Sequence, residues 1–120
     1  MKMAHVTIMT EHLDESVAFY EEIVGLKIER DMRADPAHQI VFLANAAGEP
    51  CVELVRNDDA PYTGGGLLIG FEVEDAAAYR EKLMGMGMEV GEMVSPNPHA
   101  RFFCVKDPNG VEIQFVQEGI

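Results

Sequence analysis

Apolar and polar residues alternate in short runs along this chain. In the run 5–9, Val6 and Ile8 point to one face, while His5, Thr7 and Met9 point to the other. This period of two is typical of a strand that is buried on one side only. The chain is therefore expected to begin with a strand whose polar face carries a histidine.

A helical pattern follows this strand. Val17, Tyr20 and Val24 recur at helical spacing, and Asp14 stands where an N-cap residue is expected. Gly25 then supplies the left-handed conformation that commonly follows the end of a helix. The pattern predicts a helix that begins just after Asp14 and ends just before Gly25.

The remaining patterns predict further strands and one more helix. In the first half, strands are expected at 27–30, 39–43 and 51–55. In the second half, we expect a strand at 67–73, a helix at 75–84 ended by Gly85, and strands at 88–90, 101–106 and 111–116. The turn 107–110 contains Pro and Asn-Gly, which favour a hairpin between the last two strands.

The two halves repeat one another. Residues 17–26 align with 77–86, residues 51–55 with 112–116, and residues 5–8 with 68–71. Repeats of this length indicate one supersecondary unit stacked against its copy. The sequence therefore predicts an α+β fold of two tandem βαβββ modules, with helices outside a curved mixed sheet. The 120 residues would form a single domain, with module one at about 1–56, a linker at 57–66 and module two at about 67–120.

Charge and composition exclude several classes of function. The chain has 9 basic and 21 acidic residues and a net charge of −12, which argues against nucleic-acid binding and against an anionic membrane surface. It lacks the apolar run of a signal peptide or a membrane span, so a cytoplasmic protein is expected. Cys51 and Cys104 lie in apolar strand patterns, which favours free buried thiols over a disulfide.

Strand parity predicts which polar residues share the face away from the helices. His5 and Glu53 fall on that face in the first half, and Leu68, Glu112 and Gln114 fall on it in the second. A carboxylate on a partly apolar sheet face must be solvated, paired or ligated. These residues are therefore candidates for a site, although an open, wet face would also accommodate them without any function.

Several motifs together give a resemblance to a known superfamily. They are His5 placed eight residues before Leu13, the run 16–20 leading to Gly25, the strand 70–75, and the run 101–103 leading to the turn 107–110. With these motifs the chain resembles the glyoxalase, bleomycin-resistance and dioxygenase superfamily, also called vicinal oxygen chelate proteins. The resemblance implies two βαβββ modules around a U-shaped sheet, a small-molecule ligand and a homodimer.

The resemblance also implies positions for a divalent metal such as Zn, Ni, Mn or Fe. They map to His5, Glu53, Leu68 and Gln114. Leucine cannot ligate a metal, and the Gln114 amide offers an oxygen but cannot exchange a proton near neutral pH. The expected metal ligands are thus His5, Glu53 and Gln114, an incomplete set. A dioxygenase would want two histidines and a carboxylate, so this activity is not expected.

Two functions follow as expectations. The first is a glyoxalase-like lyase or isomerase of small molecules, in which Glu53 is the catalytic base beside a carbonyl and a metal assists. The alternative is a metal-free binding protein for a drug or metabolite, with a pocket formed by Leu68, Glu112 and Phe103. Whether Phe102 or Phe103 faces that pocket is left open, because both faces of their strand are apolar. A dimer-forming protein with a vestigial site is a third interpretation.

Overall fold

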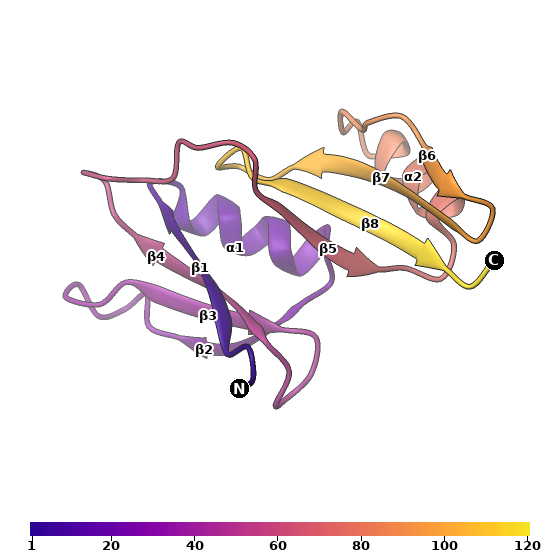
Figure 1. Ribbon diagram of the computed structural model, residues 1–120. Helices are drawn as coiled ribbons and strands as arrows, with labels where there is room; N and C mark the ends of the chain where they lie inside the picture. Colours follow the sequence, from indigo (N-terminus) through magenta and orange to yellow (C-terminus); the bar gives the residue numbers. More distant parts are fainter. The chain divides into compact units, whose positions relative to one another are not determined.

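The computed structural model describes residues 1–120, which form two compact units, Met1–Thr63 and Gly64–Ile120. The first unit contains β1 (His5–Thr10), α1 (Leu13–Glu22), β2 (Lys27–Asp31), β3 (Ile40–Ala44) and β4 (Cys51–Arg56) (Figure 1). The second contains β5 (Leu68–Glu72), α2 (Ala76–Gly85), β6 (Val94–Asn97), β7 (Ala100–Lys106) and β8 (Glu112–Glu118). The predicted α+β fold with two βαβββ modules is confirmed. The boundary between the units falls inside the expected linker.

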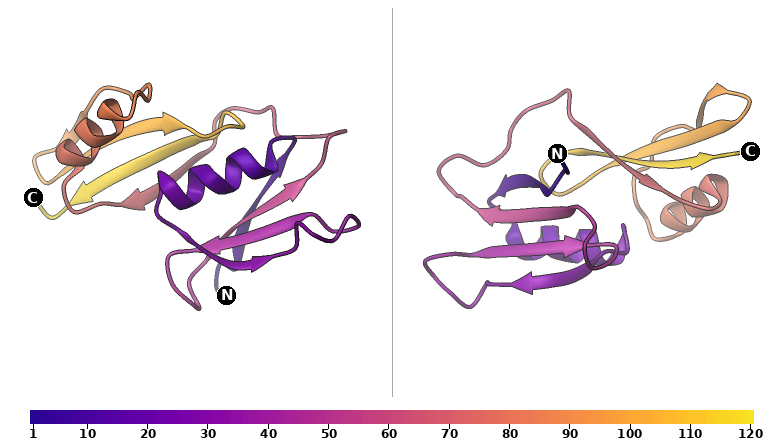
Figure 2. Two further views of the ribbon diagram at one scale, coloured as in Figure 1. Left: turned by 180° about the vertical axis from the view of Figure 1, so that it is seen from behind. Right: turned by 60° about the horizontal axis from the view of Figure 1, so that its bottom comes forward.

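The first unit is a four-stranded mixed sheet with one helix on it. Its strand order is β1-β4-β3-β2, with β1 parallel to β4 and the other pairs antiparallel. Figure 2 shows α1 lying along one face of this sheet. The core of the unit consists of strand residues with period-two spacing and the apolar stripe of α1: Ile8, Val17, Tyr20, Val41, Leu43, Val52 and Leu54.

The second unit repeats this arrangement. Its strand order is β5-β8-β7-β6, and β5 is parallel to β8. Phe103 and Phe115 pack with ring centroids 5.3 Å apart, and Tyr79 of α2 lies 5.0 Å from Phe115. The core under α2 therefore contains an aromatic cluster, as the first unit does with the rings of Phe19 and Tyr20, 5.2 Å apart.

The start of α1 differs from the prediction. Leu13 is the first helical residue and His12 occupies the N-cap position, so Asp14 lies inside the helix. The backbone N–H of His12 donates to Thr10 Oγ1 at 2.9 Å, and the Ser16 hydroxyl donates to the His12 carbonyl at 2.6 Å. These two side-chain contacts order the turn before the helix, which explains why the helix begins without a capping carboxylate.

The ends of both helices also differ in detail. Gly25 has the predicted left-handed φ of +82°, but α1 already ends at Glu22. In α2, Gly85 is still helical, and the left-handed residue is Gly87, with a φ of +82°. Neither helix has the length and apolarity that a membrane-crossing helix needs.

The edge strand of the second unit lies further along the chain than predicted. The strand expected at 88–90 does not form, and β6 instead lies between that segment and the predicted strand 101–106. Gly91 alone links the earlier segment to β7, through its N–H to the Cys104 carbonyl at 2.8 Å. Pro96 lacks an N–H, and it is accommodated because β6 is an edge strand with an irregular register.

Candidate functional site

The two polar residues predicted to converge in the first unit do so. His5 Nε2 lies 3.5 Å from Glu53 Oε1. The Thr7 hydroxyl donates a hydrogen bond to the same oxygen. The Glu53 side chain is only 15% exposed, and that of His5 is 45% exposed. The carboxylate is therefore partly withdrawn from solvent, with a hydroxyl and an imidazole beside it.

Strand pairing explains why these three side chains meet. The parallel register of β1 and β4 sets Thr7 directly opposite Glu53. His5 lies two residues before Thr7, so it projects from the same face of β1. That face is opposite to the one carrying the buried Ile8, which packs in the core with the α1 stripe. The cluster of His5, Thr7 and Glu53 is called the acid cluster below.

An aromatic side chain borders the acid cluster. Phe42 is paired with Glu53 in the β3–β4 register. The rings of Phe42 and His5 are arranged edge to face, with centroids 6.3 Å apart and an interplanar angle of 79°. The acid cluster thus has an apolar wall on one side. Sequence periodicity could place Phe42 on this face of the sheet, but it could not show that its ring lies beside His5.

The corresponding face of the second unit carries the other predicted residues. Leu68 pairs with Glu112, and Gly70 pairs with Gln114, in the parallel β5–β8 register. Leu68 is 47% exposed, while Glu112 and Gln114 are half-buried. Parity therefore correctly grouped these three side chains on one face. They belong to the second unit, whereas His5 and Glu53 belong to the first.

A depression of about 490 Å³ lies on the second unit. Cys104, Lys106, Glu112 and the segment 88–91 line it. Burial, and then the charge of Glu112, raise the pKa of the Cys104 thiol. The depression therefore presents a neutral thiol, apolar side chains, the carboxylates of Glu89 and Glu112, and the ammonium group of Lys106. Cys51 and Cys104 are both free, as expected, but each is half-buried and not buried as predicted.

Phe103, which was expected to line a ligand pocket with Leu68 and Glu112, lies on the other face of the sheet. It is fully buried in the core of the second unit, against Phe115. Phe102, its neighbour, is half-buried and pairs with Val116. A ligand on the face of Leu68 and Glu112 would therefore meet Phe102 first, because the Phe103 ring points towards α2.

The residues that could hold a metal form a partial set. His5 and Glu53 are within reach of one ion, yet no group of three His, Cys, Asp or Glu side chains comes together as a metal site. Catalytic zinc usually has three protein ligands. The two donors of the acid cluster do not by themselves fit a tightly held catalytic metal.

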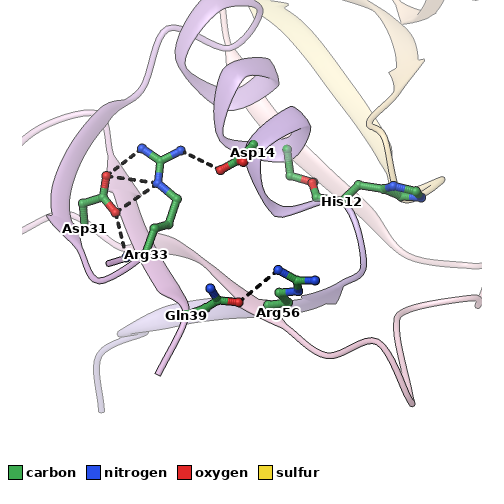
Figure 3. Close-up of polar contacts among 7 residues, drawn as sticks. His12, Asp14, Asp31, Arg33, Gln39 and Arg56 are labelled. Carbon is green, nitrogen blue, oxygen red and sulfur yellow. Dashed lines mark hydrogen bonds and ion pairs between the residues drawn. The ribbon is translucent and has the colours of Figure 1, made fainter. Parts of the chain in front are cut away.

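A second polar depression, of about 320 Å³, was not expected from the sequence. It lies at the start of α1, and Figure 3 shows its two guanidinium groups, Arg33 and Arg56. Arg33 donates to Asp31 and to Asp14, and Arg56 donates to Gln39 (Figure 3) and to Asp58. Both cations already have carboxylate partners, so the depression has no free positive charge for an anion. A sequence signal is lacking, because Arg33 and Arg56 are brought together only by the fold of the sheet.

The fold and the faces just described agree with one family. A model of the glyoxalase/bleomycin resistance protein/dioxygenase superfamily matches residues 2–115. The chain belongs to this superfamily.

Several proteins are similar to nearly the whole chain. YwbC of Bacillus subtilis (strain 168) is 28% identical over 122 residues, covering 97% of each protein. A lactoylglutathione lyase of Neisseria meningitidis serogroup A is 26% identical, over 98% of this chain and 91% of its own length. Among solved structures, the trypanothione-dependent glyoxalase I of Leishmania major has a TM-score of 0.78 and 26% identity, over 98% of this chain and 87% of its own.

Proposed function

We propose that this member of the superfamily is a glyoxalase-like lyase or isomerase acting on a small carbonyl compound. The observation that carries the proposal is the acid cluster, in which Glu53 lies 3.5 Å from His5 on a sheet face away from the helix. The similarity to lactoylglutathione lyase of Neisseria meningitidis over nearly the full chain supports this class of reaction.

In the proposed reaction, Glu53 accepts a proton from the carbon next to a carbonyl group. A carboxylate can do this when it is positioned within hydrogen-bond reach of that carbon's proton. The His5 imidazole, exposed beside Glu53, is suited to donate a hydrogen bond to the oxygen on which negative charge develops. The proton then returns from Glu53 to the former carbonyl carbon. The proton of the substrate's adjacent hydroxyl group passes to the former carbonyl oxygen, and the isomerisation is complete without a change in the protein.

The proposed reaction does not depend on a divalent metal, but binding of a metal to the protein can be measured. The donors proposed from the sequence are His5, Glu53 and Gln114, of which the acid cluster contains two. No step above requires the ion. Metal analysis of the protein purified without chelators, compared with His5→Ala, tests whether this donor set binds one.

The experiment for the enzyme proposal follows proton transfer directly. The protein is incubated in D₂O with lactoylglutathione and with simple α-hydroxycarbonyl compounds, and NMR measures deuterium entry at the carbon next to the carbonyl. Glu53→Gln should slow exchange by about 10²–10⁴-fold, the usual contribution of a general base. Glu118→Gln, at the exposed end of β8, is the matched control and should leave the rate unchanged. Exchange that survives in Glu53→Gln contradicts the proposal.

A second function rests on the depression of the second unit. Its volume of about 490 Å³ suits a small organic molecule, and its two carboxylates, Glu89 and Glu112, against the single cation Lys106 favour a cationic one. Gln114 stands where the first module has Glu53, which removes one carboxylate that proton transfer would use. In this alternative the chain binds a drug or metabolite without converting it. A thermal-shift screen with cationic aromatic compounds tests it, since a ligand of the folded state raises the Tm. A Glu112→Gln variant should lose that rise.

The proposal extends to assembly and location. We expect a homodimer in the cytoplasm, as the superfamily resemblance implies. Sedimentation equilibrium at several protein concentrations measures the oligomeric state, and a monomer at all concentrations contradicts the first expectation.

A further inference from the structure

We infer that Thr7 is a positioning residue for Glu53. The Thr7 hydroxyl holds one oxygen of the Glu53 carboxylate and thereby sets which of its two oxygens faces a ligand. The inference rests on the proposed function only in taking Glu53 as the reactive group. The hydrogen bond itself is a property of the first unit alone.

The geometry supports one defined orientation of the carboxylate. Thr7 and Glu53 are direct partners in the β1–β4 register, and the Thr7 hydroxyl donates to Glu53 Oε1. His5 Nε2 also lies nearest to Oε1, at 3.5 Å. Both neighbours therefore engage the same oxygen. Glu53 Oε2 is left as the oxygen with free lone pairs, and it is the atom suited to accept a proton from a ligand.

The chemistry of threonine suits this role. Its branched Cβ restricts rotation of the side chain, so the hydroxyl stays near one position. A hydrogen bond to an ionised acceptor is also stronger than one between neutral groups. A hydroxyl at this register position thus limits the rotation of the longer and more flexible glutamate.

The second module has no hydroxyl at the position equivalent to Thr7. Its equivalent pair is Gly70 and Gln114, and glycine has no side-chain donor. The hydroxyl is therefore present only in the module that carries the acid. This difference is expected if Thr7 serves the carboxylate, whereas a role in strand formation alone would apply equally to both modules.

Two substitutions separate the hydroxyl from the shape of the side chain. Thr7→Val keeps the branched shape and removes the donor, and Thr7→Ser keeps the donor. NMR three-bond couplings across the Glu53 side-chain bonds report whether one rotamer persists. We expect one rotamer in the unsubstituted protein and in Thr7→Ser, and averaged couplings in Thr7→Val. Thr7→Ala provides the same comparison if the valine variant does not fold.

Kinetics give a second readout. In the deuterium-exchange assay, Thr7→Val should lower kcat by about tenfold or more, as expected for losing a hydrogen bond to a charged group, with little change in KM. Thr7→Ser should restore most of the rate. Unchanged Glu53 couplings in Thr7→Val would overturn the inference. If the unsubstituted protein exchanges no proton at all, the proposed reaction fails, while the couplings still decide the role of Thr7.

Discussion

Gly70 lies opposite Gln114 across β5 and β8, so closely that a Cβ atom on Gly70 would be 3.0 Å from Gln114 Oε1. The amide group of Gln114 thus rests over the backbone of β5, in space that any other residue at position 70 would occupy. Glycine at this position determines where the Gln114 amide points.

The first prediction concerns this pair. Gly70→Ala should move the Gln114 amide and change its side-chain NMR signals. The free energy of unfolding should rise by about 0.4–1 kcal/mol, because alanine restricts the unfolded chain and the flexible end of Gln114 can give way. Gly85→Ala, whose Cβ would meet nothing within 4 Å, is the control. It should raise stability without moving Gln114. Unchanged Gln114 signals in Gly70→Ala would contradict the placement.

The second prediction separates the two adjacent phenylalanines of β7. Phe103→Ala should lower the free energy of unfolding by about 3–5 kcal/mol, because Phe103 is fully buried against Phe115. Phe102→Ala should cost clearly less, since Phe102 is half-buried. Urea denaturation of both variants measures the difference. Equal losses would mean that both rings belong to the core.

The third prediction concerns the Cys104 thiol. Burial and the charge of Glu112 raise its pKa, so less thiolate is present near neutral pH. In a Cys51→Ser background, alkylation of the Cys104 thiol by iodoacetamide at about neutral pH should be slower in the folded protein than in urea. Glu112→Gln should speed the reaction of the folded protein, because it removes the negative charge. Mass spectrometry of timed samples measures both rates, and an unchanged rate in Glu112→Gln would leave burial as the sole cause.

The fourth prediction is a pH dependence. The Arg33 side chain, followed by its backbone N–H, lowers the pKa of Asp31. A carboxyl group with a lowered pKa in the folded state stabilises the protein above its unfolded pKa of about 3.9. That stabilisation is lost as the pH falls from about 5 through the lowered pKa of the folded state.

Arg33→Gln tests this linkage. It should make the loss of stability with acid shallower, although not absent, because the backbone N–H of residue 33 still donates to Asp31. Arg30→Gln, at an exposed position of β2, is the control and should keep the slope of the unsubstituted protein. Chemical denaturation at a series of pH values measures the slopes. Identical slopes in both variants would show that the Arg33 side chain does not hold Asp31 ionised.

The sequence was sufficient to predict both helices, every strand except β6, and the faces of the central strands. Alternation in β1 and β4 put His5 and Glu53 on one face because strand side chains have a period of two. The repeat aligns Gln114 with Glu53, and it therefore predicted that Gln114 lies on the corresponding face of the second unit. Phe103 was not resolved in this way, since both faces of β7 are apolar and periodicity carries no information there.

Other features depended on contacts that no local pattern encodes. Asp14 looks like a cap, but Thr10 and Ser16 order the turn before α1 through bonds to His12. The role of Thr7 follows only from the exact register of two strands far apart in the sequence. The Arg33 and Arg56 depression likewise requires the completed sheet of the first unit.

The strand order has a consequence for synthesis of the chain. In each unit the opening strand has a single neighbour, the closing strand: β1 pairs with β4, and β5 pairs with β8. A nascent chain that has not yet delivered residues 51–56 leaves β1 without the strand with which it pairs. Distant pairing of this kind folds slowly, and an unpaired strand edge is prone to aggregate meanwhile. Ribosome pausing shortly before β4 emerges should therefore be harmful, whereas a pause after the whole first unit is exposed gives that unit time to fold.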